Sequence, residues 1–205
     1  MPEFCLPATT ANIDVLISRS IPWVLAAGSP YFLELFGGEE PAIRALQLWM
    51  RRPSSEVSIG RGQILMEGSD IAGGFIALAG PELKLARKAD ALALWKTVPA
   101  SELRALIRRM ANGANLFSPV ADDEYYLSKL GLNEEFRGKG FGSALITRYL
   151  QEGRMRGYSH YSLEVLSQND PAVRLYKSAG FQIDRQLQSR DGRFRYFSMK
   201  LETSQ

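Results

Sequence analysis

The chain has 205 residues, 45% of them apolar, which is enough for one sizeable core and too apolar for a disordered protein. Its formal net charge of +3 suits an anionic small-molecule ligand but not the concentrated basic face of a nucleic-acid-binding protein. A single cysteine and a single histidine exclude an intramolecular disulfide and a Cys/His metal cluster. Without a bilayer-length apolar run or a signal pattern, we expect a cytoplasmic protein with no membrane partner.

The N-terminal part predicts a short strand followed by helices. Residues 4–6 form a brief apolar run, and residues 11–20 show apolar positions at helical spacing. Prolines and glycines interrupt residues 21–38, so the sequence leaves their structure open. Residues 41–50 return to helical spacing, with proline in the first position of the predicted helix.

The middle of the chain predicts a hairpin followed by two helices. Residues 62–67 and 71–78 read as strands joined by a tight turn, and residues 81–112 as the helices. In the second helix Leu103, Leu106, Ile107 and Met110 form one apolar stripe, which we expect to pack in the core.

The C-terminal half alternates strands and helices. The predicted order is a strand, a glycine-rich turn, a helix, a strand, a helix and a closing hairpin, over residues 125–132, 137–142, 141–150, 160–166, 170–179, 182–188 and 194–201. Together with the first half, this order predicts a mixed α/β sheet flanked by helices.

The glycine-rich turn Arg137-Gly138-Lys139-Gly140-Phe141-Gly142 stands between a strand and a helix N-terminus. Such a junction presents unpaired backbone N–H groups, and its glycines let an anion approach the backbone closely. With two basic side chains in the same turn, we expect it to bind a phosphate or pyrophosphate.

Three stretches resemble the GCN5-related N-acetyltransferase (GNAT) family. The turn at 137–142 matches the family's Arg/Gln-x-x-Gly-x-Gly/Ala pattern after a strand that ends Leu130-Gly131-Leu132. Residues 163–181 resemble the family's late motif of strand, Asn169, helix, Leu175-Tyr176 and Gly180-Phe181. A weaker likeness covers Leu6-Pro7-Ala8-Thr9 and Asn12-Ile13, where the usual basic residue before proline is Leu6.

The resemblance implies the GNAT acyl-CoA N-acyltransferase fold, with a mixed, mostly antiparallel central sheet flanked by helices. We expect residues 1–205 to be a single GNAT domain with a helical insertion at about 81–119, between strands three and four. It also implies acetyl-CoA as acyl donor, no metal, and an amine-bearing acceptor in a monomer or homodimer.

By the same resemblance, two groups of residues would bind coenzyme A. The backbone of Leu130, Gly131 and Leu132 would pair with the pantetheine arm, and Asn169 would hydrogen-bond to that arm. The turn would hold the pyrophosphate; the binding residues implied there are Arg137, Gly138, Lys139, Gly140, Phe141, Gly142 and Ser143. Asn169 has an alternative use as a turn residue before the helix.

Tyr176 is the implied general acid for the coenzyme A thiolate and would also contact the coenzyme; its alternative is a core tyrosine. The general base is less clear, because the position of the family's strand-four glutamate holds Tyr126 here. Glu124, one step further along that strand face, is our candidate base, acting through water. Glu164 fits a strand residue without a special role, and His160 a structural or exposed residue.

The function expected is therefore N-acetylation of a primary amine by direct attack in a ternary complex. The missing strand-four carboxylate keeps open a catalytically inactive acyl-CoA-binding regulatory module. Dinucleotide binding is disfavoured, because the turn lacks the G-x-G-x-x-G spacing. The acceptor stays open among small amines, amino acids, antibiotics and protein amines.

Overall fold

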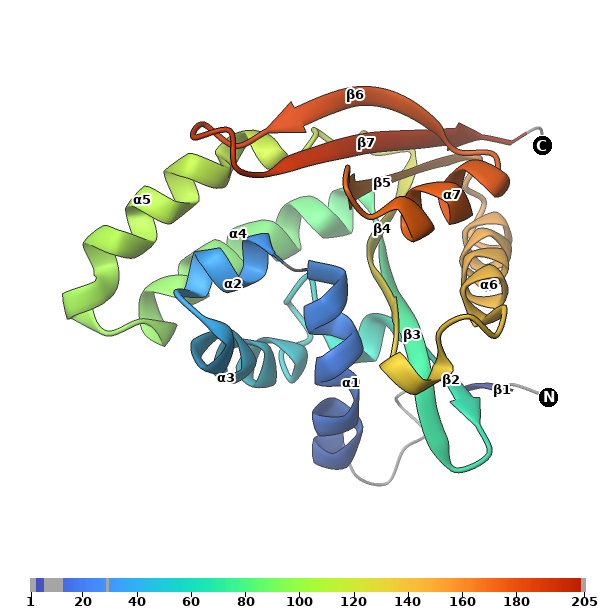
Figure 1. Ribbon diagram of the computed structural model, residues 1–205, viewed down its shortest axis with the longest axis horizontal. Coiled ribbons are helices and arrows are strands. Elements are labelled where there is room, and N and C mark those ends of the chain that lie inside the picture. The colour runs from blue at the N-terminus through green and yellow to red at the C-terminus, as the bar shows by residue number, and fades with distance from the viewer. Residues whose placement is uncertain (1–2, 6–12, 29, 204–205) are drawn as a thin grey trace.

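The structure is a computed structural model that describes residues 3–5, 13–28 and 30–203, of which 5 and 95–97 are described by their backbone alone. These residues form a seven-stranded sheet of order β1-β2-β3-β4-β5-β7-β6 (Figure 1). Every neighbouring pair in it is antiparallel except β4 and β5, which run parallel. The strands are β1 (Glu3–Cys5), β2 (Gly62–Glu67), β3 (Asp70–Ala79), β4 (Glu124–Leu132), β5 (His160–Leu166), β6 (Gln182–Gln188) and β7 (Arg195–Glu202).

Helices cover both faces of the sheet and bury a separate core on each (Figure 1). One face carries α1 (Ile13–Gly28), α2 (Tyr31–Phe36), α3 (Glu39–Met50), α4 (Gly80–Thr97) and α5 (Leu103–Gly113). The other face carries α6 (Phe141–Met155) and α7 (Asp170–Ser178). Short 3₁₀ turns lie at Ile59–Arg61, Ala100–Glu102, Ala114–Leu116 and Glu134–Phe136.

This architecture confirms the predicted fold class, a mixed and mostly antiparallel sheet with helices between the third and fourth strands. Residues 6–12, which carry the weakest part of the family resemblance, lie outside the described residues. The structure settles part of the open segment at 21–38, because α1 continues through Pro22 to Gly28. Trp23 and Val24, just beyond the proline, are buried in the core, and this packing outweighs the hydrogen bond that the proline removes.

Helix α5 buries less of its apolar stripe than the sequence predicts. Leu106 is buried, and Leu103 and Met110 are partly buried against the same core, whereas Ile107 is 47% exposed. The helix lies at the end of the molecule away from β1 and β2 and packs against α2 (Figure 1). One side of its apolar stripe therefore faces solvent.

The insertion is tied to the far end of the sheet. Asn112, near the end of α5, accepts hydrogen bonds from the backbone N–H groups of Arg190 and Asp191 in the β6–β7 turn, both 2.9 Å long. Arg193 in that turn pairs with Glu34 of α2 at 2.6 Å. The hairpin turn therefore holds α2 and α5 together over the same face of the sheet.

Gly153 lets α6 approach the sheet closely. A Cβ at this position would lie 2.4 Å from the Tyr161 ring and 2.8 Å from the Tyr125 ring, both fully buried. We therefore expect Gly153→Ala to lower the free energy of unfolding by about 1–3 kcal/mol in urea denaturation. Gly60→Ala is the matched control, since its Cβ would meet only an atom at 3.7 Å. A gain of about 1 kcal/mol from helix propensity alone would contradict this packing account.

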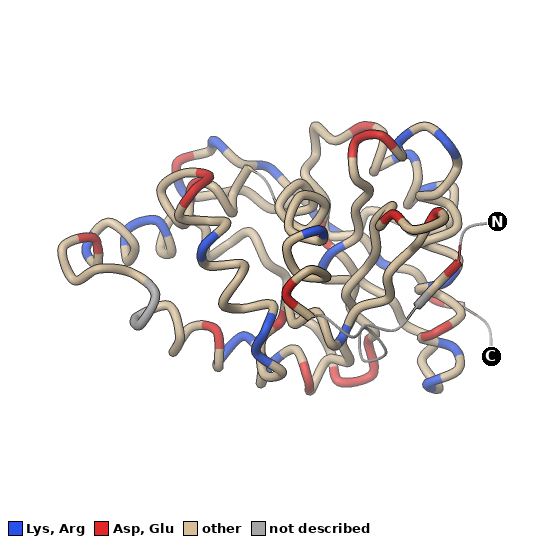
Figure 2. The backbone as a smooth tube through the Cα atoms, turned by 90° about the horizontal axis from the view of Figure 1, so that it is seen from below, with Lys and Arg blue, Asp and Glu red and all other residues tan. Residues whose placement is uncertain are grey.

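Positions of Lys and Arg are interspersed with positions of Asp and Glu along the described chain (Figure 2). Among the described residues, no helix combines the length and the apolar character needed to cross a bilayer. In the same part of the chain, no three His, Cys, Asp or Glu side chains gather as metal ligands would.

Candidate functional site

The two parallel strands at the centre of the sheet part half-way along their length. β4 pairs with β5 from Glu124 to Leu127, then continues to Leu132 paired with β3 alone. β5 continues to Leu166 paired with β7 alone. The parting opens a small cavity of about 50 Å³, called here the cleft, lined on the described chain by residues 26–27, 127–130, 164–166, Asn169, Ala172, Tyr176 and Tyr196.

A β-bulge lies where the strands part. In the β3–β4 ladder Ile76 pairs with Lys129 and Ala77 with Leu127, which leaves Ser128 as the extra residue. A bulge of this kind can turn two consecutive side chains to one face. Accordingly, the Ser128 hydroxyl donates to Glu56 at 2.8 Å, and the Lys129 ammonium lies 5.9 Å from the Phe32 ring centroid, both on the α1–α5 side.

The glycine-rich turn has the backbone that its sequence requires. Gly138 and Gly140 have φ of 76° and 82°, the left-handed region that favours glycine, and Gly140 caps α6. A Cβ on Gly142 would lie 3.3 Å from Leu175, so the first turn of α6 runs close beside α7. Phe141 is buried against Phe136, whereas Arg137, Lys139 and Ser143 are exposed.

Five of the predicted donor-site residues line two adjoining pockets. Leu130, Asn169 and Tyr176 line the cleft. Leu132 and Arg137 line a neighbouring pocket of about 340 Å³, and Ala26 of α1 belongs to both. Gly131 lies between the two on β4, where a Cβ would stand 2.5 Å from the Trp23 carbonyl oxygen; its absence lets α1 approach the strand.

Asn169 and Tyr176 both have structural surroundings of their own. The Asn169 side chain caps α7 by accepting from the Ala172 N–H at 3.3 Å, the turn use that the sequence left open. Tyr176 is buried, with its ring 6.1 Å from that of Phe181. Burial raises the pKa of the Tyr176 phenol well above its ordinary value of 10.0, so the phenol is protonated at neutral pH.

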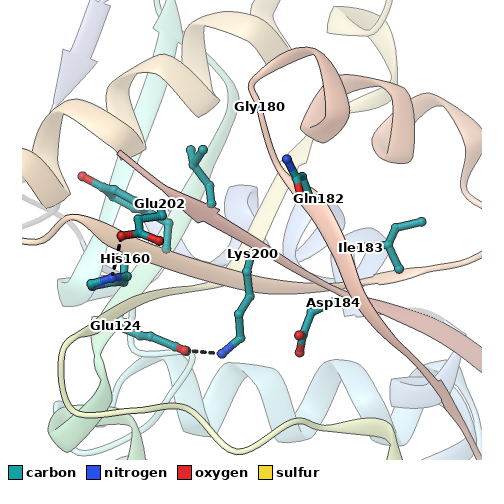
Figure 3. A pocket seen from close by; sticks show the side chains of 10 residues that line it. Glu124, His160, Gly180, Gln182, Ile183, Asp184, Lys200 and Glu202 are labelled. Carbon is teal, nitrogen blue, oxygen red and sulfur yellow. Dashed lines mark hydrogen bonds and ion pairs between the residues drawn. The ribbon is translucent and has the colours of Figure 1, made fainter. Parts of the chain in front are cut away.

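The structure does not bring Glu124 to the cleft. Glu124 is the first residue of β4, about 13 Å along the strand from Ser128 at roughly 3.3 Å per residue. Its carboxylate pairs with Lys200 in a pocket of about 520 Å³ at the opposite end of the β4–β5 pair (Figure 3). His160 lines the same pocket, half-exposed and 3.6 Å from Glu202. Glu124 as general base therefore stays a prediction without support from this geometry.

A larger cavity adjoins the cleft on the α1–α5 side. It has a volume of about 360 Å³ and shares Ala27, Ser128, Lys129, Glu164 and Tyr196 with the cleft. Because charged groups gather inside it, we call it the charged cavity; these are Glu56, Arg87, Asp90, Lys129 and Glu164. Aromatic and aliphatic side chains from α2, α3, α4 and α5 form its walls.

Glu164 bridges the cleft and the charged cavity. One carboxylate oxygen accepts from the Tyr126 hydroxyl at 2.5 Å, and the other from the Ser118 N–H at 3.0 Å. Burial raises the pKa of Glu164 above its ordinary value of 4.5, although both hydrogen bonds oppose the shift. A carboxylate of this kind is a stronger base than an exposed one.

Glu56 and Arg87 form an ion pair in the charged cavity. Arg87 Nε lies 3.2 Å from a Glu56 oxygen, and the guanidinium carbon lies 5.1 Å and 5.3 Å from the ring centroids of Tyr126 and Phe117. Burial alone would raise the pKa of Glu56, but the charges of Arg87 and Lys129 and two hydrogen bonds lower it. Glu56 is therefore ionised at neutral pH.

Solved structures of similar fold include acetyltransferases. An N-acetyltransferase from Staphylococcus aureus Mu50 has a TM-score of 0.61 and 21% identity over 80% of this chain and 81% of that chain, which shows a shared fold. A model of the Acetyltransferase (GNAT) family matches residues 106–181. By this match, residues 106–181 belong to the GNAT family. The matched residues contain the bulge, the glycine-rich turn, Glu164 and Tyr176, and leave out Glu56 and Arg87.

Curated GNAT relatives match shorter segments. A mycothiol acetyltransferase of Corynebacterium aurimucosum is 43% identical over 54 residues, 26% of this chain and 18% of that protein. A thialysine N-epsilon-acetyltransferase of Sus scrofa is 34% identical over 65 residues, 32% of this chain and 38% of that protein. The chain thus spans much less than two thirds of either relative, and their acceptors are properties of those proteins.

Sequence reasoning missed most of the charged cavity. It assigned Glu164 no role, although the alternation of β5 places a carboxylate between two buried residues, Leu163 and Val165. Glu56 follows α3 and Arg87 lies on the insertion helix α4, and no motif marks either residue. Only the folded chain brings them to the β4 bulge.

Proposed function

We propose that this chain is an acetyl-CoA-dependent N-acetyltransferase, which transfers an acetyl (acyl) group to a primary amine by direct attack in a ternary complex. The observation that carries the proposal is the cleft between β4 and β5, which Tyr176 and Glu164 both line. An acid and a base on one small cavity are what acyl transfer to an amine requires.

The residues of the donor region suit coenzyme A. The left-handed glycines and the N-terminus of α6 present backbone N–H groups to a pyrophosphate, and Arg137 and Lys139 are exposed beside them. Beyond Leu127, the edge of β4 that faced β5 has no strand partner among the described residues, so an extended pantetheine arm has a backbone edge to pair with. A β4 N–H there would polarise the thioester carbonyl.

The reaction then needs two proton transfers. The neutral amine nitrogen attacks the thioester carbonyl carbon and gives the proton that it then has in surplus to Glu164; the C–N bond forms and the C–S bond breaks. The coenzyme A thiolate leaves and takes the proton of the Tyr176 hydroxyl. Proton exchange with solvent then returns Glu164 and Tyr176 to their starting states.

Glu164 replaces the strand-four carboxylate that the sequence lacks. Tyr126 occupies the position of that glutamate on β4. Its hydroxyl donates a hydrogen bond to the carboxylate of Glu164, which lies on the neighbouring parallel strand β5. We propose Glu164, and not Glu124, as the general base, since Glu164 alone of the two lines the cleft.

Thermal shift and thiol release test this function. Coenzyme A at about 100 times its Kd should raise the Tm by roughly 5–10 °C, since such saturation adds about 2.7 kcal/mol. Acetyl-CoA with an amine panel should then release a free thiol. Stabilisation by NAD alone would rule out the donor site, and stabilisation by acetyl-CoA without thiol release from any amine would indicate an inactive acyl-CoA-binding module.

A further inference from the structure

The charged cavity combines apolar walls with a polar floor. Its walls include Phe32 and Trp49, whose ring centroids are 6.2 Å apart, together with Leu35, Leu94, Met110 and Phe117. Its volume of about 360 Å³ is near the lower end of the roughly 300–1,000 Å³ of small-molecule sites. A compact molecule with an apolar side chain fits these walls.

The carboxylates on the floor already have hydrogen-bond donors. Glu56 accepts from Ser128 with one oxygen and from Arg87 with the other. Glu164 accepts from Tyr126 and Ser118 in the same way. Asp90 accepts from the Ser55 hydroxyl and from the Glu56 N–H with one oxygen, whereas its Oδ1 is buried without a hydrogen-bond partner, 4.0 Å from Arg52. Both oxygens of Glu56 and of Glu164 are therefore engaged, and one oxygen of Asp90 is open.

The cations on the floor have donors to spare. The Nη2 atom of Arg87 is buried without a hydrogen-bond partner. Lys129 donates to the carbonyl and the hydroxyl of Ser128 alone, and none of the ion pairs within 4.0 Å among the described residues includes it. A buried Arg87 donor without a partner, beside a part-buried Lys129 ammonium outside any ion pair, calls for an anionic acceptor group.

We propose that the charged cavity is the acceptor site and binds an α-amino acid with an apolar side chain, with Arg87 and Lys129 receiving its carboxylate. The assignment rests on the proposed function, because it places the amine of the amino acid at Glu164, where the cleft and the charged cavity meet. It adds the substrate class, which comes from Lys129 within the family match and from Arg87 and the walls on α2, α3 and α4 outside it.

The spacing of the charged groups favours an α-amino acid over a longer ω-amino acid. Both polar ends lie against Tyr126: its ring centroid is 5.1 Å from the Arg87 guanidinium carbon, and its hydroxyl donates to Glu164 at 2.5 Å. An amine at Glu164 and a carboxylate at Arg87 therefore belong to one short backbone. The side chain of that molecule then points to the apolar walls.

A matched pair of product-like ligands tests the carboxylate without turnover. N-acetyl-L-phenylalanine and N-acetylphenethylamine differ only in that group, and calorimetry in the presence of coenzyme A measures their Kd. We expect the carboxylate to tighten binding about 10- to 100-fold, the range of one or two charge-assisted hydrogen bonds. Equal Kd values would overturn the proposal.

Variants assign the effect to residues. Lys129→Met should raise the Kd of N-acetyl-L-phenylalanine about tenfold and leave that of N-acetylphenethylamine within about twofold. Arg87→Lys keeps a cation beside Glu56 but loses the planar fork, and should act in the same direction. Lys84→Met on the same helix α4 is the control, since Lys84 pairs with exposed Asp122 and lies outside the cavity. Equal losses for both ligands in Lys129→Met would contradict a carboxylate contact.

Thiol release separates this proposal from the wider one. L-Phenylalanine and L-leucine should exceed phenethylamine and the peptide Phe-Gly-Gly in kcat/KM about tenfold or more. Turnover of phenethylamine or the peptide at equal efficiency would overturn the amino-acid assignment and keep the acetyltransferase. Carboxylate-dependent binding without turnover of any amine would keep the amino-acid site and overturn the acetyltransferase.

Discussion

Replacing Glu164 with glutamine is expected to lower kcat/KM by about 100- to 10,000-fold, the range for loss of a general base. The amide keeps the shape of the side chain and one oxygen acceptor for Tyr126 or Ser118, but it cannot take a proton from the amine. Steady-state thiol release over pH 5–9 measures the loss, and urea denaturation measures the fold.

Glu152 supplies a matched control for this variant. Glu152 lies on α6, away from the cleft, and accepts from the hydroxyl of Tyr125 at 2.6 Å. Tyr125 is the neighbour of Tyr126 on β4, so this second Tyr–Glu hydrogen bond resembles the one between Tyr126 and Glu164. Glu152→Gln should leave kcat/KM within about twofold of the parent, because no proton-transfer role is lost. A similar loss in both variants would mean that the Tyr–Glu bond supports the fold and not the chemistry.

The pH profile adds a signature that a structural role would not give. Burial raises the pKa of Glu164 above 4.5, so the base is lost as the pH falls through that raised value and kcat/KM falls with it. The effect of pH on stability is opposite to its effect on activity. Below pH 4.5 the neutral carboxyl favours the folded state, and this contribution to the free energy of unfolding disappears as the pH rises through the folded pKa. Glu164→Gln should therefore lose the acid limb of the profile without lowering stability at neutral pH.

The sequence predicted those parts of the fold whose signals are local. The Asp-Gly turn fixed the β6–β7 hairpin, and β6 has the predicted bounds, Gln182–Gln188. Gly138 and Gly140 of the 137–142 turn have positive φ, a backbone requirement that a sequence pattern can express. Helix α1 was only partly predicted, because a proline inside a helix is overridden by tertiary packing that local rules do not contain.

The candidate site was predicted only where its residues lie on contiguous stretches of the chain. The predicted donor residues come from two runs of chain, one around β4 and α6 and one around α7, and a motif describes each. The charged cavity instead takes Glu56 from the segment after α3, Arg87 from α4 and Glu164 from β5. The β4 bulge turns Ser128 toward Glu56, and strict alternation along a strand does not predict a bulge.

Glu124 shows the limit of reasoning by strand face. Counting along β4 gave it the same parity as Tyr126, but parity says nothing of how far along the strand the site lies. The site lies where β4 and β5 separate, and their pairing, which ends at Leu127 and Leu163, is a property of two strands together. The carboxylate that reaches the cleft is therefore the one on the partner strand.

Tyr176→Phe should lower kcat by about 100-fold or more while the Kd of coenzyme A stays within about twofold. The variant removes one oxygen and keeps the ring that packs against Phe181. Because burial raises the pKa of the phenol, Tyr176 stays protonated throughout the usable pH range, so its loss should lower the rate without moving the basic side of the profile. Single-turnover thiol release measures the chemical step, and calorimetry with coenzyme A measures the affinity.

Tyr158→Phe is the control for the loss of a hydroxyl on the same side of the sheet. Tyr158 stacks on Tyr125 at 5.4 Å and does not line the cleft, so its variant should keep the parent rate. An unchanged single-turnover rate in Tyr176→Phe would mean that solvent protonates the departing thiolate and that Tyr176 is a core residue. A lower rate together with a weaker Kd for coenzyme A would assign the phenol to donor binding. Only a lower rate at constant affinity identifies it as the acid, because proton delivery is felt in the transition state and not in the bound ground state.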